Sequence, residues 1–91
     1  MIENQYQAGL KKRLKSMLTK LDSSDIQGIP DLLILYKNKW AILEVKKDAE
    51  APHRPNQDYY VAKLNEMSFS RFIFPENEEE VLNELYKAFK S

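Results

Sequence analysis

The sequence lacks cysteine altogether, and it lacks any long apolar run. Without cysteine the chain can form neither a disulfide framework nor a thiolate zinc site, which fits a reducing compartment. No uninterrupted apolar stretch approaches the roughly 20 residues that a membrane-spanning helix needs. The polar start MIENQYQ is unlike a secretory signal peptide. We therefore expect a protein of the cytoplasm.

An excess of charge of one sign is also missing, since Lys and Arg total 14 and Asp and Glu total 14. Zero net charge is unusual for a protein that holds nucleic acid by charge alone, because phosphate binding favours a basic surface. The charges are nevertheless unevenly spread, with basic KKRLK at 11–15 and acidic ENEEE at 76–80. Either cluster alone is typical of a solvated helix face.

With two glycines, 43% hydrophobic and 31% charged residues, the 91-residue sequence predicts one globular domain, 1–91. Apolar residues three and four apart predict helices over 2–21, 57–67 and 76–90. Short apolar runs predict strands over 31–36, 40–46 and 71–74, the first two joined by a hairpin turn. DSSD and DAEAPHRPNQ indicate loops. The order α-β-β-α-β-α predicts an α/β fold in which helices flank a small mixed sheet.

The second strand of the hairpin carries two charged residues on one face. Side chains alternate along a strand, so Glu44 and Lys46 point the same way and Val45 points the opposite way. The face on which Asp31 lies, at the start of the first strand, depends on the register. A two-residue turn places Asp31 on the face of Glu44 and Lys46, whereas a three-residue turn without a bulge separates them.

Neighbouring carboxylates repel each other, and a lysine beside them on a largely apolar face is costly without compensation. A divalent cation would compensate, because Asp31, Glu44 and the backbone carbonyl of Val45 offer hard oxygen ligands that suit Mg²⁺ or Mn²⁺. Lys46 would then orient or deprotonate an attacking water, or neutralise charge on a phosphate. Such a site would hydrolyse a phosphodiester. Pro-Asp and Glu-x-Lys are common structural pairs when taken singly, so the hypothesis rests on their combination.

The stretch GIPDLLILYKNKWAILEVKK, at 28–47, resembles the core of the PD-(D/E)xK nuclease superfamily. Within that superfamily, GIPD, LEVK and RPNQDYY resemble the virus-type replication-repair nuclease (VRR-NUC) domain in its short stand-alone phage form, over most of the chain. The resemblance implies a restriction-endonuclease-like fold, Mg²⁺ or Mn²⁺ dependence and DNA endonuclease activity. It also implies similarity to Holliday junction resolvases that act as homodimers, in the host-cell cytoplasm if phage-encoded, with no small-molecule cofactor.

The resemblance also assigns roles to single residues. Asp31 and Glu44 match the metal-binding acids, and Lys46 matches the catalytic lysine. Gln57 matches the glutamine that opens the helix after the hairpin, and Glu3 matches an acid near the start of the first helix. From position alone, Gln57 is also explained as a helix-capping side chain and Glu3 as a solvated first-turn acid.

Several basic side chains are candidates for contacts with DNA phosphates. His53, the one histidine of the chain, is expected to contact phosphate or to be an ordinary loop residue rather than a metal ligand. The candidates are Lys47, His53 and Arg54 in the loop after the hairpin, and Lys11, Lys12 and Lys15 in the first helix.

The helix predicted over 57–67 contains two adjacent tyrosines, Tyr59 and Tyr60. Aromatic rings of this kind can stack on nucleobases. However, Tyr60 shares a helical face with Val61, Leu64 and Met67, and tyrosines at helical spacing are more often core residues. The buried interpretation is therefore favoured for this face.

The leading hypothesis is a structure-selective DNA endonuclease that cuts branched DNA, because so short a chain has little room for base-reading loops. A twofold homodimer would present two active sites to two strands. The alternative is a non-catalytic DNA-binding or replication-protein assembly module that retains a nuclease-like fold. Only the enzyme requires Asp31, Glu44 and Lys46 to cluster.

Overall fold

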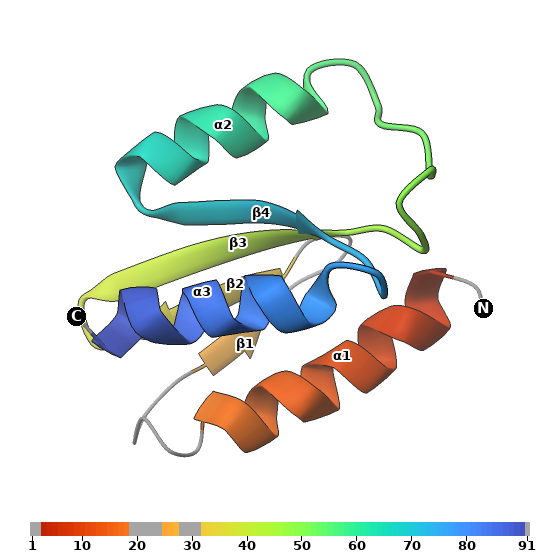
Figure 1. Cartoon of the computed structure of the whole chain (residues 1–91). Helices are drawn as coiled ribbons and strands as arrows, with labels where there is room; N and C mark the ends of the chain where they lie inside the picture. Colours follow the sequence, from red (N-terminus) through yellow and green to blue (C-terminus); the bar gives the residue numbers. More distant parts are fainter. Residues whose placement is uncertain (1–2, 19–24, 28–31, 91) are drawn as a thin grey trace.

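The computed structural model describes residues 3–18, 25–27 and 32–90, which form a four-stranded mixed sheet with helices on both faces (Figure 1). The strands follow the order β1-β2-β3-β4 across the sheet. None of the described helices is both long and apolar enough to cross a membrane. The elements are α1 (Glu3–Leu18), β1 (Asp25–Gln27), β2 (Leu32–Tyr36), β3 (Lys39–Val45), α2 (Gln57–Met67), β4 (Phe69–Ile73) and α3 (Glu78–Lys90).

The α/β class and the mixed sheet between helices are confirmed, but the predicted order of elements omits one strand. Residues 25–27, expected as loop, form β1 and pair antiparallel with β2. Three residues, two of them polar, are too few to show a strand pattern, and the neighbouring strand supplies their pairing. The last strand begins two residues earlier than predicted, at Phe69. Residues 19–21, included in the predicted first helix, lie outside the described residues.

The hairpin of β2 and β3 closes through a two-residue turn, because Tyr36 pairs with Lys39. Lys37, the first turn residue, has a φ of 55°, the positive value that a tight hairpin turn requires. The pairing continues to Leu32 opposite Leu43. Of the two registers left open by the sequence, the structure therefore has the one produced by a two-residue turn.

One face of the sheet carries the hydrophobic core. Ala41, Leu43 and Val45 of β3 point into it, as the alternation of side chains predicts, and all three are buried. Helices α1 and α3 cover this face (Figure 1). They contribute buried residues at a spacing of four, which are Tyr6, Leu10 and Leu14 of α1 and Val81, Leu85 and Phe89 of α3.

The other face is covered by α2, which connects β3 to its parallel neighbour β4 (Figure 1). The prediction that α2 has a buried apolar face is wrong, because none of its residues is buried. Val61 and Leu64 are half-buried, while Tyr60 and Met67 are 58% and 67% exposed. The apolar stripe of this single helix is therefore only partly covered by the sheet.

Candidate active site

Two charged side chains are buried near the end of β3 on the face that α2 covers. Glu44 is 7% exposed, and Lys46, which directly follows the last residue of β3, is 6% exposed. Removing a carboxylate and an ammonium from water costs several kcal/mol for each ion, so charged residues are rarely buried without a partner. The local fold therefore pays an energetic penalty at this position, which marks it as a functional-site candidate.

Gln57, the first residue of α2, joins these two residues. Its side-chain Nε2 donates a hydrogen bond to Glu44 Oε1, and its Oε1 accepts one from Lys46 Nζ at 2.9 Å. Lys46 Nζ also donates to the backbone oxygen of Pro52 at 3.2 Å. An amide can serve both neighbours because it has a donor and an acceptor at its end. The expected position of Gln57 at the start of the helix is confirmed, and its side chain contacts both charged residues.

The loop between β3 and α2 holds Gln57 in this orientation. The backbone N–H of Arg54 donates to Gln57 Oε1 at 2.6 Å, and the N–H of Gln57 donates to the oxygen of Arg54 at 3.1 Å. Asn56 has a φ of 74°, in the left-handed region that asparagine tolerates better than most residues. The Gln57 side chain therefore bonds both to the backbone just before the helix and to the two charged residues of the sheet.

His53 fixes the same loop from outside the site. Its ring stacks on Phe72 of β4 with centroids 4.0 Å apart, and its Nδ1 lies 2.9 Å from Asp58 Oδ1 of α2. These contacts give His53 a role in tethering the loop to β4 and α2. Its expected role as a phosphate contact stays a prediction.

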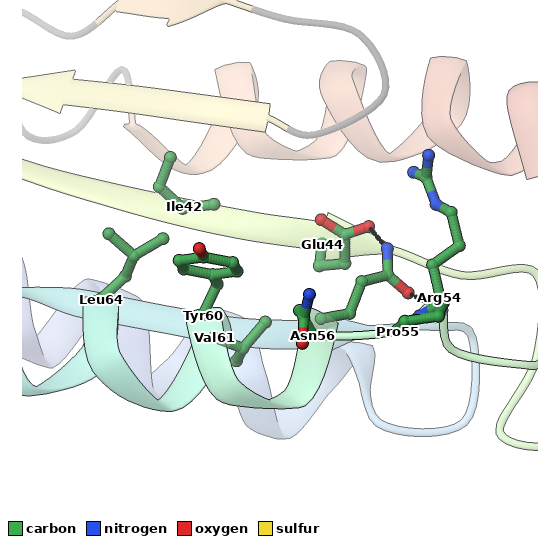
Figure 2. A pocket seen from close by; sticks show the side chains of 9 residues that line it. Ile42, Glu44, Arg54, Pro55, Asn56, Tyr60, Val61 and Leu64 are labelled. Atoms are coloured by element: carbon green, nitrogen blue, oxygen red, sulfur yellow. Dashed lines mark hydrogen bonds between the residues drawn. The ribbon is translucent and has the colours of Figure 1, made fainter.

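A cavity of about 400 Å³ opens beside Glu44, between β3 and α2 (Figure 2). Its polar end is formed by Glu44, Asn56 and Gln57, and Arg54 lies at its edge with the side chain extending away from the helix. Its apolar end is formed by residues of β3 and α2. A concave site with a few convergent polar groups on an apolar wall is typical of ligand-binding sites.

Asp31, the first acid of the predicted site, lies outside the described residues. Glu3 begins α1, but its side chain also falls outside the description. Figures 1 and 2 place the start of α1 at the end of the sheet where β3 finishes. Within the described part of the chain, no three His, Asp or Glu side chains form a group that could hold a metal ion.

The candidate DNA-binding residues fall into two groups. Lys47 and Arg54 are exposed next to the buried pair. Lys12 and Lys15 are exposed and Lys11 is half-buried on α1, which packs on the opposite face of the sheet (Figure 1). The structure therefore brings the loop residues close to the site and leaves the α1 lysines in another layer.

A second polar cluster ties α1 to α3 on the core side. Glu78 accepts hydrogen bonds from the Tyr6 hydroxyl at 2.9 Å and from Arg13 Nε and Nη2 at 2.5 and 2.7 Å. Burial alone would raise the pKa of Glu78, but the hydrogen bonds from Arg13 and Tyr6 outweigh it and hold that pKa below its usual value. The pKa of Tyr6 is raised, mainly by burial and to a lesser extent by the hydrogen bond to Glu78. No sequence spacing could indicate contacts between helices at opposite ends of the chain.

Comparison with known proteins gives no assignment. No protein-family model matches the chain, and no curated protein and no solved structure matches it. Function is therefore inferred from the site residues themselves.

Proposed function

We propose that the protein is a metal-dependent DNA endonuclease with a PD-(D/E)xK core. The observation that carries the proposal is the buried pair of Glu44 and Lys46, two residues apart on one face of β3 and bridged by Gln57. A stable fold has no need of a carboxylate and an ammonium at this position, since apolar side chains would remove the desolvation cost. Catalysis at a phosphate does need them.

The topology around the pair supports the same proposal. An antiparallel hairpin is followed by a helix and then by a strand parallel to the second hairpin strand. The acid and the lysine lie at the end of that second strand, and the glutamine opens the helix. The acid, the lysine and the glutamine are the residues to which the resemblance to the VRR-NUC domain assigns catalytic roles.

The residues also fit a divalent cation. The hairpin has the register of a two-residue turn, which is the register for which the sequence predicts Asp31 and Glu44 on one face. The N–H of Lys46 donates to Ile73 of β4 at 2.9 Å, and alternation along a strand then turns the carbonyl of Val45 toward β2. Asp31, Glu44 and that carbonyl would hold Mg²⁺ or Mn²⁺. When bound, the ion would act as a Lewis acid on the phosphate.

The other residues of the site would position the reaction. In hydrolysis, a water oxygen bonds to phosphorus, one P–O ester bond breaks, and the departing oxygen gains a proton. Lys46 would orient or deprotonate the water, or neutralise charge on the phosphate as the bond breaks. Gln57 would hold Glu44 and Lys46 in fixed positions, because its one side-chain amide is hydrogen-bonded to both.

We propose branched DNA, such as a Holliday junction, as the substrate and a homodimer as the working form. Leu33 and Leu35 of β2 share the sheet face of Ile42 by register, and Leu35 is 40% exposed. This hairpin surface is the candidate dimer contact. Leu35→Lys should convert a dimer to a monomer in light scattering coupled to gel filtration, with the thermal midpoint as folding control. A wild-type protein that is monomeric at all concentrations would contradict the dimer.

The nuclease proposal is tested by cleavage of a synthetic four-way junction and of matched linear duplex, each with Mg²⁺, Mn²⁺ or EDTA. Wild type should cut the junction preferentially and only with metal, while Lys46→Ala and Glu44→Gln should lose cutting. Lys63→Ala is the control, because it removes an exposed lysine of α2 that lies outside the proposed site. If no DNA is cut and the junction is bound equally well in EDTA, the protein is a non-catalytic DNA-binding or assembly module.

A further inference from the structure

We propose that the cavity between β3 and α2 receives an unpaired nucleobase of the DNA strand, next to the proposed site of the reacting phosphate at Lys46 and the cation. This inference rests on the proposed function, and it specifies the substrate as a strand with an unstacked nucleotide at the site. Glu44 of the buried pair and Gln57, which bridges the pair, both line the cavity, so a ligand in the cavity lies beside the proposed site.

The walls of the cavity suit a flat aromatic ligand. Ile42 of β3 lies across from Tyr60 and Leu64 of α2, and Val61 completes the apolar lining (Figure 2). The volume of about 400 Å³ falls in the range of sites that enclose small ligands. An apolar wall with an exposed tyrosine ring is the surface on which a nucleobase stacks, whatever its sequence.

The polar end of the cavity suits the edge of a base and its phosphate. Asn56 offers an amide donor and acceptor at the wall, and its left-handed backbone places it there at the start of α2. Glu44 is two residues from Ile42 along β3, about 7 Å at the usual rise of a strand. That span is comparable with the distance from the phosphate of a nucleotide to its own base. The Arg54 side chain, which extends away from α2, is available for an adjacent phosphate (Figure 2).

Tyr60 is distinguished from its neighbour by this geometry. Tyr59 and Tyr60 are exposed to nearly the same extent, 61% and 58%. Their rings meet edge to face with centroids 5.1 Å apart, but of the pair only Tyr60 lines the cavity. Tyr60 is exposed at the cavity, and the helix that carries it has no buried residue, so its ring contributes little to the core. Its ring is free to stack on a ligand.

A fully paired duplex cannot fill the cavity without losing a base pair, because each base is enclosed in the stack. Unstacking costs a few kcal/mol in duplex and least where the base is already unpaired. The cavity therefore favours DNA with an unpaired nucleotide, such as the branch point of a junction or a flap. This selectivity needs no recognition of base sequence.

The test is titration of 2-aminopurine-labelled DNA in EDTA and again in Ca²⁺, with the fluorescent base either unpaired at a branch or paired in duplex. Wild type should bind the unpaired form more tightly and change its fluorescence by stacking. Tyr60→Ala should weaken binding of the unpaired form roughly 5- to 150-fold, the range expected from loss of one base stack. Tyr60→Phe should retain binding, and Tyr59→Ala is the matched control.

Three outcomes would overturn the inference: equal binding by Tyr60→Ala and wild type, no fluorescence change for the unpaired base, or no binding of either DNA in both solutions. A change of oligomeric state in Tyr60→Ala would instead assign Tyr60 to a contact between protein copies. The two proposals fail separately. Metal-dependent cutting that is insensitive to Tyr60→Ala would contradict only the proposal that the cavity binds a nucleobase. Tyr60-dependent stacking without any cutting would contradict only the nuclease proposal.

Discussion

The side-chain amide of Gln57, the first residue of α2, donates a hydrogen bond to the carboxylate of Glu44, near the end of β3. This bond links an element of the sheet to the helix that covers it. Because the same amide also accepts from Lys46 at 2.9 Å, the relative placement of the two buried charges depends on how α2 packs on the sheet. The site is thus assembled by the crossover from β3 to β4.

Gln57→Ala should reduce DNA cleavage roughly 10- to 100-fold, as loss of a residue that orients metal-binding or catalytic groups usually does. Glu44 and Lys46 would each lose a hydrogen-bond partner, while the core under α1 and α3 stays intact. The measurement is kcat/KM on a four-way junction together with the thermal midpoint. Lys63→Ala, an exposed change on the same helix, is the control. Unchanged kcat/KM in Gln57→Ala would restrict Gln57 to a structural role.

Ser70→Ala should leave stability unchanged or raise it by about 1 kcal/mol. Ser70 is 1% exposed, and its hydroxyl has no hydrogen-bond partner in the described part of the chain. A buried hydroxyl without a partner costs free energy that a methyl group avoids. The measurement is the free energy of unfolding in urea. A loss of more than about 1 kcal/mol would show that the hydroxyl is satisfied in solution, for instance by water.

Glu78 should make the fold sensitive to acid. Its pKa in the folded state is held below the ordinary value, so its contribution is present above the unfolded pKa and is lost as pH falls through the folded pKa. Glu78→Gln should lower the free energy of unfolding by about 1.5–3 kcal/mol at pH 7, the usual contribution of a hydrogen bond to a charged group, and by less at pH 3. Urea unfolding at both pH values measures this, with Glu79→Gln as control. Equal losses at both pH values would contradict the charge-based explanation.

The two groups of basic residues should differ in their contribution to DNA binding. Lys47 and Arg54 lie beside the site, whereas Lys12 is on α1, in the layer on the other face of the sheet. The logarithm of the DNA-binding constant falls as the logarithm of salt concentration rises. Lys47→Ala and Arg54→Ala should each reduce the magnitude of that slope by about 1, as expected for one lost phosphate contact. Lys12→Ala should leave the slope unchanged. A larger effect of Lys12→Ala would place the DNA along α1.

Much of the fold follows from short-range patterns in the sequence. The alternation in WAILEVK predicts which side chains of β3 enter the core, and the structure buries Ala41, Leu43 and Val45 there. It also predicts that Glu44 and Lys46 share the opposite face. Asn56 and Gln57 follow a loop with two prolines, and the helix begins at Gln57 as predicted. Local periodicity and turn residues determine these features, so the sequence alone reveals them.

Other features depend on contacts that no local pattern records. β1 exists because β2 offers an edge for pairing, although DIQ has little tendency to form a strand. The exposure of Tyr60 depends on how much of the sheet face remains uncovered, and its spacing with Leu64 indicates burial wrongly. The hydrogen bond from Lys46 to Pro52 and the Arg13–Glu78 pair join segments whose approach is set by packing. For each of these, tertiary structure outweighs the local signal.

The absence of any buried side chain on α2 has a consequence for how the molecule opens. Free energies of local unfolding vary across a protein, and segments with few buried apolar contacts open first. The core formed by α1, α3 and the sheet can stay closed while α2 lifts, carrying Gln57 away from Glu44 and Lys46. Amide protons of α2 should then exchange with solvent well before those of β3 and α3. Among the described helices, the one that completes the site is also the one with no buried side chain, so the site can open while the core stays folded.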